Sequence, residues 1–171
     1  MIDITREISP DTEVYPGDSE TKITKVKSIE KDDYALSKIE MSLHCGTHVD
    51  APSHYISGAK DVEDLPALIK APAIFCENVF EVDINRGDFV LMKEELSLDE
   101  AEYLIKKEVF GVGVECLTIG SKDVHLTLLS KDIIVIEGLD LKEVKKGKYT
   151  LYCMPLRIKG VEGAPVRCIL M

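Results

Sequence analysis

The sequence predicts a mixed α/β fold with a largely β core and helices packed against it. Short apolar runs with strand character recur along the whole chain, and segments with helical periodicity are interspersed among them. The length of 171 residues suits one domain, so we expect a single domain over residues 1–171. Strands outnumber helices in this pattern, but the pattern alone sets no strand order.

The candidate strands are bounded by glycine, proline or charged turns. The first covers residues 2–8 and is followed by a turn-rich stretch that includes Tyr15-Pro16-Gly17-Asp18. Residues 38–44 alternate strictly between apolar and polar, which is typical of a half-buried strand and would put His44 at a strand end. The other candidate strands are residues 73–76, 88–92, 111–114, 133–137, 149–158 and 166–170.

The clearest predicted helix covers residues 97–109. Ser97 and Glu100 have the spacing of a capping box, and apolar residues recur at helical spacing from Leu98 onward. A second, shorter helix is expected over residues 62–69. Both helices would pack on the β core.

Charge and composition argue against several kinds of partner. The net charge is -10 and basic residues do not cluster with aromatic ones, so we expect no nucleic acid partner. No apolar run approaches the ~20 residues that a membrane span needs, so we expect no membrane partner. The first residues do not read as a signal peptide, and the five cysteines show no CxxC spacing, so we expect a cytoplasmic protein.

Three of the four histidines lie in residues 44–54, at His44, His48 and His54. His44 and His48 together with Asp50 offer two imidazoles and a carboxylate, which are ligands for Zn, Mn or Fe rather than for Ca or Mg. Glycine, β-branched residues and proline fill the intervening positions and disfavour a helix. The sequence therefore predicts a metal site on a strand that bends at a glycine turn.

Three donors are too few to close a metal shell, which leaves room for water. A metal-bound water ionises near pH 7 instead of ~15.7, and the departing amine of an amide needs a proton, which His54 could supply. A closed structural site would be rich in thiolate, but we expect Cys45 to pack into the core. A non-catalytic metal-binding protein stays open as an alternative.

These residues resemble the signature of the cyclase family of metal-dependent hydrolases, HxGTHxDxPxH, a family that includes bacterial kynurenine formamidase and isatin hydrolase. The matching positions are His44, Gly46, Thr47, His48, Asp50, Pro52 and His54. The turn at residues 15–18 is similar to the family's aromatic-Pro-Gly-Asp turn, and His125 and Glu137 are similar to its distal His and Glu pair. Residues 155–157 and 164–167 match the family's C-terminal end.

The resemblance implies a swivelling β/β/α domain that binds one or two divalent ions, usually Zn or Mn. The implied ligands are His44, His48, Asp50, His125 and Glu137, with Asp50 bridging in a two-ion site. The implied catalytic acid/base is His54. The family also implies a homo-oligomer, a homodimer or homotetramer, with the pocket near a subunit interface.

Independently of the family, Glu137 ends an apolar run and needs a partner there, whereas the surroundings of His125 are equally typical of a loop end. The turn near the N-terminus has Tyr15 where formamidases usually have Trp, and the segment from residue 92 to the helix at 97 leaves little room for a lid.

The leading interpretation is a metal-dependent hydrolase that cleaves a small amide, in the manner of an arylformamidase, by a metal-bound hydroxide and a histidine acid/base. N-formylkynurenine is one candidate among small-molecule substrates. The alternatives are a lactam or lactone hydrolase, a cyclase or dehydratase of the same family, and the non-catalytic metal-binding protein.

Overall fold

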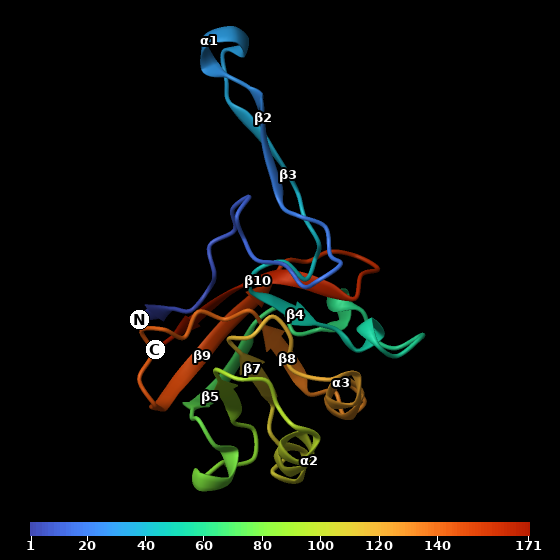
Figure 1. Cartoon of the computed structure of the whole chain (residues 1–171), viewed down its shortest axis with the longest axis vertical. Helices are drawn as coiled ribbons and strands as arrows, with labels where there is room; N and C mark the ends of the chain where they lie inside the picture. The colour runs from blue at the N-terminus through green and yellow to red at the C-terminus, as the bar shows by residue number, and fades with distance from the viewer.

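The computed structural model describes all 171 residues and is built around a closed β-barrel. Seven strands form the ring in the order β10-β4-β8-β7-β6-β5-β9, and pairing between β9 and β10 closes it (Figure 1). The short strand β1 pairs with β10 outside the ring. The strands are β1 (Ile2–Asp3), β4 (His48–Asp50), β5 (Ile69–Phe75), β6 (Phe89–Met92), β7 (Gly111–Val114), β8 (Ile134–Glu137), β9 (Gly147–Pro155) and β10 (Gly163–Leu170).

Strands β5 to β8 run parallel, and two helices flank their outer face: α2 (Leu98–Lys106) connects β6 to β7, and α3 (Lys122–Leu129) connects β7 to β8. Alternation along each strand divides the apolar side chains between two cores. Phe89 and Leu91 belong to the cluster inside the barrel, whereas Val90 and Met92 belong to the cluster between the barrel and the helices. The expected β core with flanking helices is confirmed.

The capping box predicted for the first helix is present at the start of α2. The backbone N–H of Ser97 donates to the Glu100 carboxylate at 2.8 Å, and the backbone N–H of Glu100 donates to the Ser97 hydroxyl at 3.3 Å. The helix expected over residues 62–69 is wrong. Only the 3₁₀ turn η2 (Val62–Asp64) forms there, because the residue before Pro66 disfavours helical dihedrals and β5 begins at Ile69.

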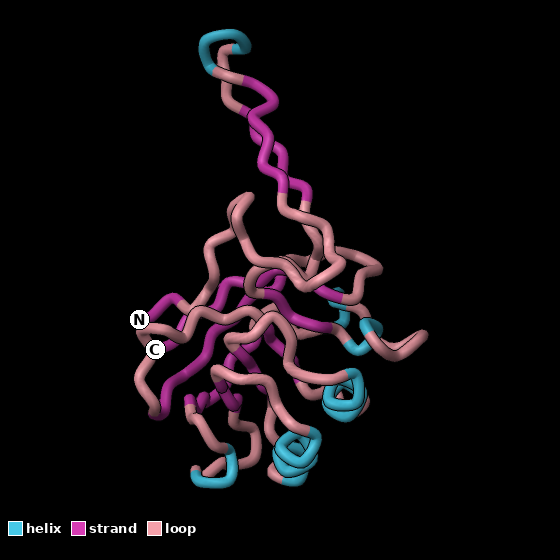
Figure 2. The backbone as a smooth tube through the Cα atoms, viewed as in Figure 1, coloured by secondary structure: helices cyan, strands magenta, loops and turns pink.

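A two-stranded arm projects from the barrel and overturns a second expectation. The arm consists of β2 (Lys22–Lys27), the single turn α1 (Ile29–Asp32) and β3 (Leu36–Glu40), and Figure 2 shows no other strand beside it. The expected half-buried strand over residues 38–44 is therefore wrong: β3 ends at Glu40, Ile39 is 48% exposed, and His44 lies in a turn. Alternation indicates a strand but not whether a core covers its apolar face.

The first expected strand is also shorter than residues 2–8. Regular pairing covers β1 alone, and Thr5 then makes an isolated bridge to Leu139. Two further 3₁₀ turns complete the chain, η1 (Pro52–His54) and η3 (Val79–Glu81). No helix of the structure has both the length and the apolar character that a membrane crossing requires.

Candidate metal centre

The donors predicted from the sequence meet on the outer face of the barrel at β4 and β8. His48 and Asp50 lie two residues apart on β4 and share this face, while Val49 between them points into the barrel core. In the antiparallel β4–β8 pair, His48 lies directly opposite Glu137. Strand alternation and register therefore bring three of the predicted ligands together.

The loop that carries His44 is held across the end of β8 by two glycines. Both Gly46 and Gly138 have a φ of +67°, and a Cβ on Gly138 would lie 2.2 Å from the carbonyl oxygen of Gly46. The Thr47 hydroxyl donates to the Gly138 carbonyl at 2.6 Å. The Gly-Thr pair of the motif thus fixes the loop that brings His44 to the site.

Backbone carbonyls orient two of the imidazole rings. The Nδ1 of His48 donates to the Gly46 carbonyl at 3.1 Å, and the Nδ1 of His125 donates to the Ser121 carbonyl at 3.0 Å. Because a carbonyl only accepts, each ring carries its proton on Nδ1 and turns Nε2 toward the site. This arrangement is typical of metal-ligating histidines, whose second nitrogen is held by an outer partner.

Asp50 lies among the three histidines His44, His48 and His125, and its carboxylate accepts no hydrogen bond. It is 1% exposed, and neither carboxylate oxygen has a hydrogen-bond partner. Oδ1 lies 3.0 Å from His44 Nδ1 and 3.5 Å from His48 Nε2, and Oδ2 lies 3.6 Å from His125 Nε2. A buried carboxylate without partners is costly, and a cation among these donors removes the cost.

Two groups of three donors are close enough to hold an ion, with ligand atoms within 4.8 Å of one another. One group is His44, His48 and Asp50, and the other is Asp50, His54 and His125. Nε2 of His44 and Nε2 of His48 are also buried without hydrogen-bond partners. The imidazole and carboxylate donors suit Zn or Mn, so these residues fit a divalent metal.

Glu137 lies against the histidines and already has a backbone partner. Its Oε1 accepts the Ile119 N–H at 2.6 Å and lies 3.0 Å from His125 Nε2, and its Oε2 lies 3.2 Å from His48 Nε2. Burial alone would raise the pKa of Glu137, but the close contacts with His125 and His48 outweigh burial and lower the pKa to about 2. The carboxylate is therefore ionised beside the donor groups, and its role as a ligand stays a prediction.

The same contacts raise the pKa of the two histidines, His48 and His125. Burial disfavours the charged rings, yet the carboxylates of Glu137 and Asp50 more than compensate and raise the pKa of both His48 and His125. Both rings therefore hold a proton more strongly than a free imidazole does.

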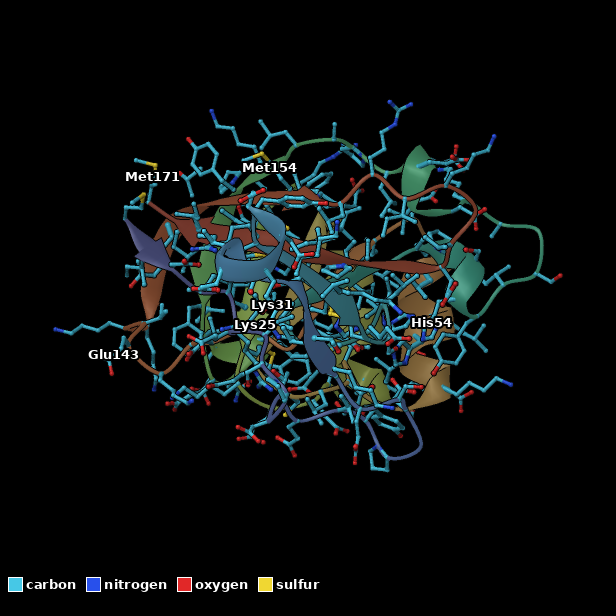
Figure 3. The ribbon with its side chains drawn as sticks, turned by 90° about the horizontal axis from the view of Figure 1, so that it is seen from above. Lys25, Lys31, His54, Glu143, Met154 and Met171 are labelled. Carbon is cyan, nitrogen blue, oxygen red and sulfur yellow. The ribbon has the colours of Figure 1, made fainter.

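His54 belongs to the second donor group and lies beside the first. Its ring centroid is 4.2 Å from that of His44 and 5.9 Å from that of His125. Burial lowers the pKa of His54, which leaves it neutral at pH 7 and able to accept a proton. Its position suits a proton-transfer residue and also places a nitrogen among the ligand atoms, so its acid/base role stays a prediction. Figure 3 shows His54 on the opposite side of the barrel from Met171 and Glu143.

An open cavity of ≈ 400 Å³ adjoins the cluster, large enough for a small molecule. Tyr15 and Asp18 line it from the N-terminal turn, where the Asp18 N–H donates to the Tyr15 carbonyl at 2.9 Å. Sequence reasoning missed Tyr55, which lines the same cavity and packs its ring 4.5 Å from those of His54 and His125. Its place directly after the motif was the available signal.

Cys45 behaves as the sequence predicts. It is 1% exposed, and its sulfur lies 3.0 Å from the Thr21 hydroxyl rather than among the donors. Its sulfur is in neither group of donors that could hold an ion. The site is thus built from imidazoles and carboxylates, with a cavity on its open side.

Fold and site together define a barrel-cored α/β protein with a divalent-metal site. A family model described as "Putative cyclase" matches residues 2–96. Kynurenine formamidase of Salinibacter ruber (strain DSM 13855 / M31) is 30% identical over 99% of this chain and 96% of its own length. Cyclase-like protein 2 of Oryza sativa subsp. japonica is 35% identical over 80% of this chain and 65% of its own length.

Solved structures agree with these relatives. A potential metal-dependent hydrolase with cyclase activity superposes with a TM-score of 0.86 at 31% identity, covering 99% of this chain and 96% of its own. Isatin hydrolase A from Labrenzia aggregata shares the fold, with a TM-score of 0.83 at 20% identity over 99% of this chain and 92% of its own. The chain belongs to the cyclase family.

Proposed function

We propose that this protein is a metal-dependent hydrolase that cleaves the C–N bond of a small amide, as arylformamidases do. The hydrolase class expected from the sequence is confirmed by the kynurenine formamidases of Salinibacter ruber and of Maricaulis maris (strain MCS10), the latter 28% identical over 99% of this chain and 97% of its own length. The observation that carries the proposal is the buried, unpaired carboxylate of Asp50 among three histidines beside an open cavity.

The proposed cofactor is Zn or Mn, as one or two ions. A divalent ion bound here would polarise the substrate carbonyl and activate water for attack. His44, His48 and Asp50 would hold it, with His125 and Glu137 next to them. Asp50 also lies beside His125, which supports a second ion that shares this carboxylate, but an ion that used His54 as well would remove its role in proton transfer.

The chain's own residues provide the proton transfer. His54 is neutral at pH 7 because burial lowers its pKa, so it can take a proton and deliver it to the nitrogen of the leaving amine. The Tyr55 ring packs against His54 and limits how far it can turn. Neutral His54 beside the cavity is suited to an amide, whose nitrogen leaves poorly without protonation.

The cavity supports a small formylated amine as substrate, with N-formylkynurenine one candidate. Its volume of ≈ 400 Å³ is at the lower end of ligand sites, and Tyr15 and Tyr55 offer aromatic walls. A screen of formanilides, isatin and simple lactones on metal-loaded protein separates cleavage of an open-chain formamide from opening of a lactam or lactone ring. Turnover of isatin without turnover of formanilides would contradict the formamide substrate, and turnover of lactones alone would contradict the amide assignment.

The metal requirement is tested with Asp50→Asn, which keeps the shape of the side chain and removes its charge. We expect loss of stoichiometric Zn or Mn in metal analysis and loss of formanilide hydrolysis. Asp83→Asn changes an exposed carboxylate that belongs to neither donor group and does not line the cavity, so it should alter neither. Full metal content and activity in Asp50→Asn would contradict the proposal.

We also propose that the protein works as a homo-oligomer on small molecules in the cytoplasm. Five free cysteines, four of them buried, support a reducing compartment. The net charge of -10 disfavours nucleic acid as a partner. The oligomeric state is measurable by light scattering, and the arm offers the surface that would form the interface.

A further inference from the structure

The imidazole ring of His44 lacks the support that two other predicted ligands have. His48 and His125 each donate from Nδ1 to a backbone carbonyl and turn Nε2 toward the site. No backbone group holds either ring nitrogen of His44, and its Nε2 is buried without a hydrogen-bond partner. A metal-ligating histidine normally has an outer partner on its second nitrogen. The partner of His44 must therefore be a side chain.

The two ring nitrogens of His44 face different carboxylates. Nδ1 lies 3.0 Å from Oδ1 of Asp50, and the same oxygen lies 3.5 Å from Nε2 of His48. An ion held by Asp50 and His48 would therefore take Nδ1 of His44 as its third donor. Nε2 of His44 instead lies 3.5 Å from Oε1 of Glu162. A neutral imidazole whose Nδ1 binds a cation carries its proton on Nε2, so Glu162 faces that proton.

The carboxylate of Glu162 is free to accept a hydrogen bond from Nε2. His44 is the only basic residue in ion-pair contact with it, and no backbone or side-chain group donates a hydrogen bond to it. The side chain is 45% exposed and can rotate. The 3.5 Å contact can therefore shorten to a hydrogen bond once Nε2 carries the proton.

The backbone fixes Glu162 next to the site. Its carbonyl accepts the Ala51 N–H at 2.8 Å, and the next residue, Gly163, is the direct partner of Asp50 in the β10–β4 pair. A Cβ on Gly163 would lie 2.6 Å from Cε1 and 2.8 Å from Nε2 of His44. Because glycine stands there, the ring can lie against β10 with Nε2 beside Glu162. The Glu-Gly pair thus provides both the space for the ring and the acceptor for its proton.

We propose that Glu162 is a positioning residue that makes His44 bind the metal through Nδ1. This inference rests on the metal-dependent function proposed above. A carboxylate behind an imidazole fixes the tautomer and the orientation of the ring, and it raises the basicity of the nitrogen that binds the ion. Glu162 belongs to neither donor group and does not line the cavity, so it acts through His44 alone. His44 then binds in the opposite tautomer to His48 and His125.

The first test measures Zn affinity by competition against a chromophoric chelator. Glu162→Ala should raise the Zn dissociation constant by about 10–100-fold, the usual effect of losing an outer partner of a ligand. Glu162→Gln keeps an oxygen that can accept from Nε2, so its value should lie between those of the wild type and Glu162→Ala. The matched control is Glu143→Ala, which removes the same charge on the opposite side of the barrel from His54 (Figure 3) and should leave the affinity unchanged.

The second test determines the tautomer directly. Long-range hydrogen–nitrogen correlation spectra of the Zn-loaded protein distinguish, for each imidazole, the nitrogen that carries the proton from the nitrogen that binds the metal. We expect the proton on Nε2 in His44 and on Nδ1 in His48 and His125. Urea unfolding of metal-free Glu162→Ala should keep the wild-type midpoint, because a half-exposed ion pair contributes little to stability. A purely structural role would change that midpoint and would not set the tautomer.

The outcomes separate this inference from the proposed function. Unchanged Zn affinity in Glu162→Ala, an equal loss in Glu143→Ala, or a Zn-bound His44 with its proton on Nδ1 would overturn the role of Glu162. Each of these results leaves hydrolysis of formanilides by the wild type untouched. Conversely, a Zn-loaded protein that shows the expected tautomers and cleaves no formanilide would refute the proposed function and leave this inference intact. A wild type that binds neither Zn nor Mn would overturn both.

Discussion

Replacing Gly163 with alanine should displace His44 and weaken metal binding while the barrel stays folded. Gly163 lies on β10 opposite Asp50, and a Cβ there would be 2.6 Å from Cε1 and 2.8 Å from Nε2 of His44. Carbon atoms in contact prefer ~3.5–4.0 Å, so the imidazole must move by roughly 1 Å.

A shift of that size should strongly reduce metal affinity but should change the free energy of unfolding only slightly. Metal–nitrogen bonds tolerate about ±0.2 Å around ~2.0–2.1 Å, so the displaced ring no longer reaches the ion. The loss should be at least the ~10–100-fold in affinity that follows removal of a supporting group outside the ligand shell, or about 1.4–2.7 kcal/mol. The His44 side chain is partly exposed and can swing outward, so the free energy of unfolding should change by less than the ~1–3 kcal/mol of overpacking in a closed core.

The assay is a competition titration of Zn against a chromophoric chelator, paired with urea unfolding of the metal-free protein. Gly160→Ala is the control, because nothing lies within 4 Å of its Cβ but its φ of +68° disfavours alanine. It should lose ~1–2 kcal/mol of stability and no metal affinity, the reverse of the expected pattern for Gly163→Ala. Unchanged Zn affinity in Gly163→Ala would show that His44 is not a ligand.

Three further outcomes are expected. His54→Ala should keep its metal while formanilide hydrolysis falls by about 10²–10⁴-fold. The loss of activity should be smaller on nitroanilides, whose leaving group needs little protonation. Loss of the metal, or an equal loss of activity on every leaving group, would make His54 a ligand or a positioning residue. Ser97→Ala should lower the free energy of unfolding by about 1 kcal/mol in urea titration, because it removes the cap of α2, and an unchanged midpoint would contradict this. In the metal-free protein, the lowered pKa of Glu137 gives stability that is present above its ordinary pKa of 4.5 and is lost as the pH falls. The raised pKa of His48 gives stability that is present below 6.5 and is lost as the pH rises. In urea titrations at different pH values, Glu137→Gln should therefore reduce the fall of the unfolding midpoint on the acid side.

The strands that the sequence predicts best are those buried on both faces. Residues 111–114 match β7 at both ends, because every side chain there is apolar or glycine and no solvent-facing position blurs the pattern. The predictions for residues 38–44 and 62–69 are wrong because these segments are not buried strands of the barrel. Their apolar spacing is compatible with a strand and a helix, but the first has no core against it and the second runs into a proline.

The site residues that are close together in the sequence could be predicted, whereas those that are brought together by the fold could not. The donors between His44 and His54 could be predicted from the sequence because they lie close together in one short segment. His125 was ambiguous because α3 went unpredicted, although Ser121 is its N-cap and Val124 and Leu128 recur at helical spacing. The distance between His125 and Asp50 depends on how α3 docks on the barrel, which no local pattern contains.

The register of β4 against β8 explains how a short chain brings Glu137 beside His48 and Asp50. A slip of one residue would place Ile136 opposite His48 and turn Glu137 toward the other face. That register is fixed by the contact between Gly46 and Gly138 and by the Thr47 hydroxyl, where the loop before β4 crosses the end of β8. The alignment with the Salinibacter ruber formamidase spans 204 residues against 171 in this chain, so the relative carries insertions that this chain lacks. Since the donors depend on barrel register and the cavity walls depend on loops, we expect the missing segments to alter the range of substrates and to leave metal binding unchanged.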